Sequence, residues 1–84
     1  MDAGIEFSQS AFKHGITEEN IRYAFAHPIV DFPVAGEEEK NLLIGFDQNA
    51  NVLEILYNVE GVQRINVFHA MKCRKIWRRS FVKG

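Results

Sequence analysis

The pattern of hydrophobic and polar residues predicts strands in the middle of the 84-residue chain and helices on either side of them. Three apolar segments have the length of strands, and residues typical of turns separate them. They cover residues 41–47, 52–58 and 63–71. A shorter apolar segment at residues 5–7 predicts a first strand. Because there is no internal repeat or linker, we expect a single domain over residues 1–84.

Signals for two helices lie between the first strand and the segment at 41–47. Ser8 or Ser10 is placed to cap a brief helix, and Gly15 favours the turn that ends it. Thr17 is typical of the N-cap of a second helix, because two glutamates follow it at the positive helix end. This second helix is predicted to stop before Pro28, since the residue preceding a proline disfavours helical backbone.

The last two strands are expected to form a hairpin whose register decides which side chains share a face. We prefer to pair Val59 with Gln63 across a three-residue loop, because a two-residue turn at 60–61 would mix apolar and polar side chains. The predicted apolar face holds Leu53, Ile55, Tyr57, Ile65 and Val67, with His69 at its far end. The opposite face holds Val52, Glu54, Leu56, Asn58, Arg64, Asn66 and Phe68. Such a mixed face is typical of a binding surface, and equally of a merely solvated one.

After Met71 the spacing changes from that of a strand to that of a helix. Cys73, Ile76, Trp77 and Ser80 lie at helical spacing and form one largely apolar stripe. The basic positions are Arg74, Lys75, Arg78 and Arg79. The apolar stripe is predicted to pack on the sheet and to bury Trp77. The expected fold class is therefore α+β: an antiparallel sheet of three to four strands, two N-terminal helices and one basic C-terminal helix.

The net charge of −1 conceals a separation of charge along the chain. Residues 1–60 carry 11 acidic and three basic groups, a balance of −8, whereas residues 61–84 carry seven basic groups and no acidic one. This asymmetry favours a polyanion such as RNA, or an acidic protein, as partner. With one cysteine, Cys73, and no membrane span or signal pattern, the sequence predicts a cytoplasmic location.

The residue types exclude several kinds of catalysis. No glycine-rich elbow surrounds a serine, and no glycine-rich loop precedes a Lys-Ser/Thr pair. His14, His27 and His69 occupy separate elements, so we expect no metal and no other cofactor. Metal-free RNA cleavage remains, because it needs only a base, an acid and cations that stabilise the phosphorane. The residues available for it are Lys13, His14, Arg64, His69, Lys72 and Arg74.

Two short motifs resemble the opening of BrnT-type toxins, a family within the RelE-like ribonuclease superfamily. They read Phe12-Lys13-His14-Gly15-Ile16 and Phe25-Ala26-His27-Pro28. The resemblance implies a RelE-like fold, an RNA-cleaving toxin encoded with an antitoxin, and a site that includes Lys13, His14 and Lys72. The chain departs from the family pattern at the end of its last strand, where Met71 replaces an expected arginine and His69 a small hydroxyl residue. It also has Phe7-Ser8 in place of a Trp-Asp pair.

Together these observations predict the toxin of a bacterial type II toxin–antitoxin module, acting as a metal-independent endoribonuclease on mRNA. The predicted catalytic residues are Lys13, His14, Arg64, His69 and Lys72. The predicted RNA-binding residues are Arg74, Lys75, Arg78 and Arg79. The expected partners are the antitoxin and RNA, with no membrane, and an oligomer with itself or with the antitoxin stays open. Two alternatives also stay open: a non-catalytic module whose basic helix docks an acidic partner, and a nucleic-acid binder without chemistry.

Overall fold

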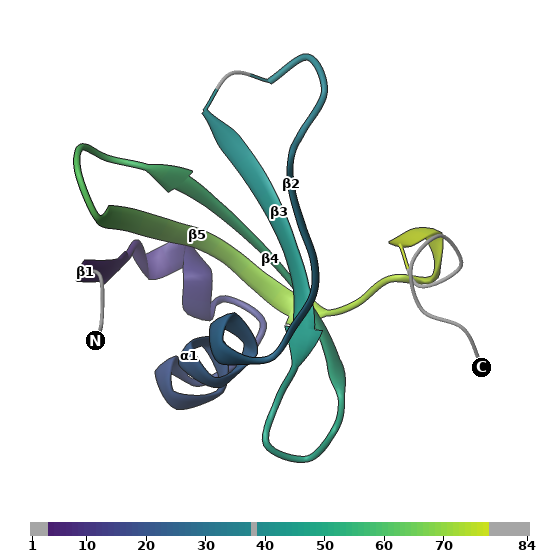
Figure 1. The fold of residues 1–84 in the computed structure, drawn as a ribbon. Helices are drawn as coiled ribbons and strands as arrows, with labels where there is room; N and C mark the ends of the chain where they lie inside the picture. The colour runs from purple at the N-terminus through teal and green to yellow at the C-terminus, as the bar shows by residue number, and fades with distance from the viewer. Residues whose placement is uncertain (1–3, 38, 78–84) are drawn as a thin grey trace.

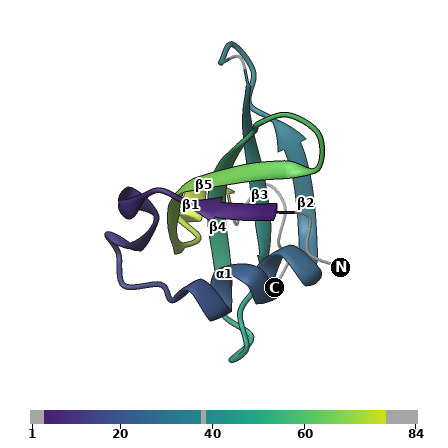
Figure 2. The ribbon, with the colours of Figure 1, turned by 90° about the vertical axis from the view of Figure 1, so that its left-hand side faces the viewer.

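Five strands form one mixed β-sheet in the computed structural model, which describes residues 4–37 and 39–77 (Figure 1). In chain order the elements are strand β1 (Gly4–Phe7), the 3-10 helix η1 (Gln9–Phe12), helix α1 (Glu18–Ala26) and strands β2 (Pro28–Pro33), β3 (Lys40–Phe46), β4 (Val52–Val59) and β5 (Arg64–Lys72). The order across the sheet is β1-β5-β4-β3-β2. β1 runs parallel to β5, whereas the other neighbouring strands are antiparallel (Figure 2).

This architecture corrects the expected fold class. The sheet has five strands and is mixed, and the described residues contain one α-helix instead of two N-terminal helices and a C-terminal one. The first expected helix is only the four-residue η1, where Ser8 makes no side-chain capping bond. β5 runs to Lys72, and helical backbone appears only at residues 75–77, where the described chain ends. The RelE-like arrangement that we expected is therefore wrong.

Helix α1 forms where its capping signals predict it. The Thr17 side chain accepts a hydrogen bond from the backbone N–H of Asn20 at 3.2 Å, and Glu18 and Glu19 occupy the first turn. The helix ends at Ala26, immediately before the His27-Pro28 pair. Within the described ranges, no helix has the length and apolarity needed to cross a membrane.

β2 is the strand that the sequence analysis missed. Prolines at both of its ends, Pro28 and Pro33, argue against a central strand, because a proline has no N–H to donate to a sheet. The structure resolves this conflict by placing β2 at the edge of the sheet, beside β3 only. At an edge, the missing donors leave no neighbouring strand unpaired.

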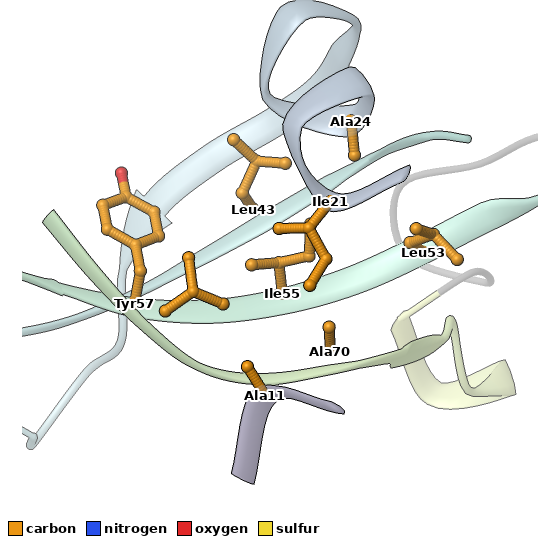
Figure 3. Packing of buried hydrophobic residues seen from close by; sticks show 9 residues of the cluster. Ala11, Ile21, Ala24, Leu43, Leu53, Ile55, Tyr57 and Ala70 are labelled. Carbon is orange, nitrogen blue, oxygen red and sulfur yellow. The ribbon is translucent and has the colours of Figure 1, made fainter. Parts of the chain in front are cut away.

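Two hydrophobic clusters cover the two faces of the sheet. On one face, α1 and η1 pack against side chains of β3, β4 and β5 (Figure 3). The fully or almost fully buried members are Ala11, Ile21, Ala24, Leu43, Leu53, Ile55, Tyr57, Val67 and Ala70. On the other face, Leu42 and Ile44 pack with Cys73, and Trp77 lies partly buried against them. Trp77 therefore packs on the sheet as its spacing from Cys73 predicts, but Ile76, expected on the same stripe, is 66% exposed.

The β4–β5 hairpin has a longer loop than we predicted. Val59 pairs with Ile65, and Tyr57 pairs with Val67, so the preferred register was wrong by two residues. A shift by two residues keeps each side chain on the same face of the sheet. The predicted apolar face is confirmed as part of the core; it consists of Leu53, Ile55, Tyr57, Ile65 and Val67. His69 is the exception. An irregularity in the pairing between Tyr57 and Leu56 places it on the opposite face from the one that we predicted.

Gly45 in β3 allows α1 to lie directly on the sheet. A Cβ atom at this position would come within 2.5 Å of the Ala24 carbonyl oxygen and 3.0 Å of the His27 carbonyl oxygen. Both are backbone atoms that cannot rotate away, so Gly45→Ala should destabilise the fold by about 1–3 kcal/mol in denaturant unfolding. Gly4→Ala is the matched control, because its Cβ would meet nothing closer than 3.9 Å. Equal stability of the two variants would contradict this packing.

Candidate active site

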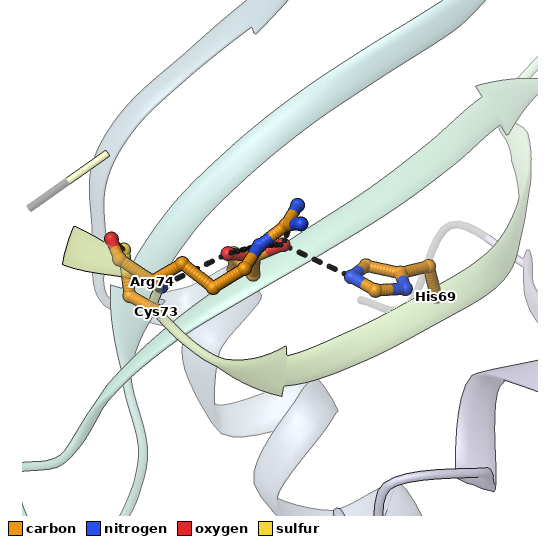
Figure 4. A network of polar contacts seen from close by, with 4 residues as sticks. His69, Cys73 and Arg74 are labelled. Carbon is orange, nitrogen blue, oxygen red and sulfur yellow. Dashed lines mark hydrogen bonds and ion pairs between the residues drawn. The ribbon is translucent and has the colours of Figure 1, made fainter. Parts of the chain in front are cut away.

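A buried carboxylate, that of Glu54, lies at the centre of the face opposite α1. Its side chain is 1% exposed, although β4 places it among apolar neighbours. Arg74 donates to it from its backbone N–H at 3.0 Å, from Nε at 3.0 and 3.1 Å, and from Nη2 at 2.8 Å. His69 contacts the same carboxylate through Nε2 at 3.0 Å (Figure 4). Glu54 thus holds one residue from β5 and one from the segment that follows it.

These hydrogen bonds keep the carboxylate of Glu54 charged. Burial by itself would raise the pKa of Glu54, because desolvation penalises the charged form. The hydrogen bonds from Arg74 and His69, together with the positive charge of Arg74, outweigh burial and hold the pKa of Glu54 below its ordinary value. An ionised carboxylate only accepts hydrogen bonds, so Nε2 of His69 must carry a proton. In the neutral ring, Nδ1 is then left as the proton acceptor.

A β-bulge in β5 points His69 towards Glu54. Tyr57 pairs with Val67 but Leu56 pairs with His69, so Phe68 is an extra residue in the strand. Without it, alternation would place His69 opposite Ile55, on the α1 face where we predicted it. The bulge turns His69 to the Glu54 face and puts the next residue, the fully buried Ala70, into the core.

The segment around η1 brings His14 to the same place. Ser8 donates its N–H to the Val67 carbonyl at 2.9 Å, and the Ser10 hydroxyl donates to the Phe68 carbonyl at 2.6 Å. η1 therefore lies along β5 at the bulge, and the turn after it presents His14. The rings of His14 and His69 are 5.6 Å apart and meet edge to face at 75°. His14 is exposed and the side chain of His69 is 21% exposed, so the pair is open to a ligand.

The structure brings together only some of the other predicted residues. Lys13 immediately precedes His14 and is exposed. Arg74 belongs to the Glu54 cluster, where its guanidinium pairs with the carboxylate while its side chain stays 54% exposed. Its predicted contact with RNA stays a prediction. Lys75 is exposed in the helical turn at the end of the described chain, and Arg78 and Arg79 lie outside the described residues.

Arg64 and Lys72 lie away from the two histidines. Arg64 begins β5, five residues before His69, and its Nε lies 3.6 Å from a carboxylate oxygen of Glu6. At about 3.3 Å per residue, that is roughly 16 Å along the strand. Lys72 pairs with Leu53, on the face opposite His69, because strand side chains alternate after the bulge. These two positions do not join the candidate site.

The sequence analysis missed the role of Glu54. We placed it on the mixed face but gave it no partner. The sequence does contain a signal for such a partner: Glu54 stands between Leu53 and Ile55 in a largely apolar strand, and a buried charge needs a compensating group. Within residues 4–37 and 39–77, no group of three or more His, Cys, Asp or Glu side chains is arranged to hold a metal ion. The cluster is suited to proton transfer by two imidazoles, one of them held by a charged carboxylate.

Comparisons with protein-family models, curated proteins and solved structures found no match to this chain.

Proposed function

We propose that this protein is a metal-independent endoribonuclease and the toxin of a toxin–antitoxin module. The observation that carries the proposal is the pair of histidines, His14 and His69, with His69 held through Nε2 by the buried Glu54. One imidazole can supply the base and the other the acid that RNA cleavage needs. The toxin role rests on the resemblance of residues 12–16 and 25–28 to BrnT-type toxins.

In the proposed mechanism, Nδ1 of His69 removes the proton of a ribose 2′-hydroxyl. The 2′-oxygen attacks the adjacent phosphorus while the bond to the 5′-oxygen of the next nucleotide breaks. His14, in its protonated form, donates a proton to that leaving oxygen. The products are a 2′,3′-cyclic phosphate and a free 5′-hydroxyl. Lys13, adjacent to His14, is the cation that we assign to the developing charge on the phosphorane.

Glu54 acts in this mechanism as a positioning residue. It does not touch the RNA, because its side chain is buried under His69 and Arg74. It fixes the tautomer of His69 in which Nδ1 is the acceptor, and its charge stabilises the imidazolium that forms when His69 takes up a proton. This is the same logic by which a buried aspartate serves the histidine of a serine protease.

The test is incubation of the purified protein with RNA in the presence of a chelator. We expect cleavage that continues without metal and leaves 2′,3′-cyclic phosphate ends, detected by their resistance to polymerase tailing until the cyclic phosphate is removed. RNA that stays intact across a range of sequences, with the protein folded, would overturn the nuclease proposal. Expression without an antitoxin tests the second part: growth arrest supports a toxin, and healthy growth with soluble protein supports the non-catalytic interaction module.

A further inference from the structure

His14 and His69 come from separate elements, but their separation allows both rings to bind one metal ion. Their ring centres are 5.6 Å apart. A Zn–N bond of about 2.0–2.1 Å places each ring centre about 3.2 Å from the metal, so two imidazoles at the tetrahedral angle have centres about 5.2 Å apart. The pair is thus within about 0.5 Å of the spacing in a zinc site. The 75° between the ring planes is compatible with such a site, because each ring can turn about its own metal–nitrogen bond.

Nδ1 of His69 is available to such an ion. Nε2 is occupied by its bond to Glu54, so Nδ1 carries the lone pair of the neutral ring. Nδ1 makes no hydrogen bond within the described residues and is not closed off from solvent, so a metal ion can reach it. In Figure 4 it lies on the side of the ring away from the carboxylate. His14 is exposed, so its ring can turn a nitrogen towards the same point.

Glu54 supplies the outer partner that is typical of a zinc-binding histidine. A metal-bound histidine almost always donates its other ring N–H to a carboxylate, a backbone carbonyl or water, which fixes the ring and makes the metal-bound nitrogen more basic. The 3.0 Å bond between Nε2 of His69 and Glu54 has this arrangement. Imidazole nitrogen suits Zn²⁺, whereas Mg²⁺ prefers oxygen ligands. Within residues 4–37 and 39–77, no third His, Cys, Asp or Glu side chain joins the pair, so water fills the remaining positions around the metal.

We propose that His14 and His69 bind Zn²⁺, and that the bound ion inhibits the nuclease. The proposed mechanism needs a free lone pair on Nδ1 of His69 and a proton on His14 for the leaving oxygen. Zn²⁺ binds a lone pair of each ring and so takes the base and the acid out of the reaction. With only two protein ligands the ion can dissociate, which makes the inhibition reversible. The binding site rests on the geometry alone, whereas the inhibition rests on the proposed function.

The first test measures binding of Zn²⁺ alone, by calorimetric titration without RNA. His14→Ala and His69→Ala should each weaken binding by about 100-fold or more, and Glu54→Gln, which removes only the outer partner, by about 10-fold or more. His14 is exposed, so His14→Ala decides the question even if a variant at the buried Glu54 does not fold. The matched control is His27→Ala, which removes another exposed histidine and should bind Zn²⁺ like the wild type. Absence of binding, or binding that survives the loss of His14 or His69, overturns the site.

The second test measures RNA cleavage at rising Zn²⁺ concentration, so that the two proposals fail separately. Once the site is saturated, the rate should fall about 10-fold or more, and it should recover when a chelator is added. Mg²⁺ at the same concentration should leave the rate unchanged. Cleavage that continues undiminished with the site saturated contradicts the inhibition and leaves the nuclease proposal standing. Zn²⁺ binding that depends on both histidines, with no cleavage of any RNA in the absence of metal, supports the site and contradicts the nuclease.

Discussion

Replacing His69 with alanine is expected to slow RNA cleavage by about 100-fold or more while leaving the fold intact. His69 is the residue whose Nδ1 accepts the ribose proton in the proposed mechanism, and its removal leaves no base at that position. His69 belongs to neither hydrophobic cluster, and Arg74 still compensates the Glu54 carboxylate when the imidazole is removed. The initial rate of cleavage of one defined RNA, at saturating and at low concentration, is the measurement.

His27→Ala is the matched control for this variant. His27 is also an exposed histidine, but it stacks on Tyr23 with ring centres 4.0 Å apart, at the end of α1. The His27→Ala variant should cleave RNA at the wild-type rate. Glu54→Gln should lower the rate without removing the base, because a neutral amide no longer stabilises the imidazolium of His69. If His69→Ala cleaves as fast as His27→Ala with both variants folded, the base lies elsewhere and His69 has a structural role.

Elements whose signals lie within a few residues were predictable from the sequence. The capping bond of Thr17 depends only on an N–H three residues away, and α1 begins where this signal places it. Strands β3, β4 and β5 follow from apolar runs of strand length, because β3 and β4 are buried on both faces and β5 is buried or half-buried along most of its length. β2 was not predictable in this way, since its prolines are acceptable only at an edge, and which strand forms the edge is a property of the whole sheet.

The position of His69 depends on one extra residue that no spacing rule reveals. Strict alternation after Val67 places His69 towards α1, and the bulge at Phe68 reverses this. The physical reason lies in contacts with distant residues. The small side chain of Ala70 fits the buried position opposite Ile55, and the Ser10 hydroxyl donates a hydrogen bond to the Phe68 carbonyl. Both contacts join distant parts of the chain, so residue chemistry alone identified His14 and His69 as candidates without showing that they meet.

The charge separation along the chain does not reveal which partner each charged side chain has in the fold. Arg74 was assigned to RNA because it lies in a run of basic residues. In the fold it is the main partner of Glu54, an acidic residue from the other part of the chain. Lys13, Lys72 and Lys75 are exposed and keep their charge available at the surface. Tertiary contacts, and not composition, determine which basic side chains form ion pairs within the protein.

Replacing Arg74 with alanine is expected to destabilise the protein by about 3 kcal/mol at neutral pH. Removing one partner of a buried ion pair leaves the other uncompensated, which typically costs about 3–5 kcal/mol. We expect the lower end of this range, because His69 still donates to Glu54 and the Arg74 side chain is 54% exposed. Lys75→Ala, the neighbouring exposed cation, should change stability by less than about 0.5 kcal/mol. Denaturant unfolding of both variants gives the comparison.

Two further measurements separate the loss of charge compensation from a loss of packing. In a Glu54→Gln background no carboxylate needs Arg74, so Arg74→Ala should then cost about 1 kcal/mol. The pH dependence has a definite sign: the pKa of Glu54 is lowered in the fold, so its contribution is complete above its ordinary value of 4.5 and is lost as pH falls through the lowered pKa. The difference between wild type and Arg74→Ala should therefore shrink as the solution is acidified below this value. A difference that stays constant with pH, and is the same in both backgrounds, would mean that Arg74 stabilises the fold by packing and not through the carboxylate of Glu54.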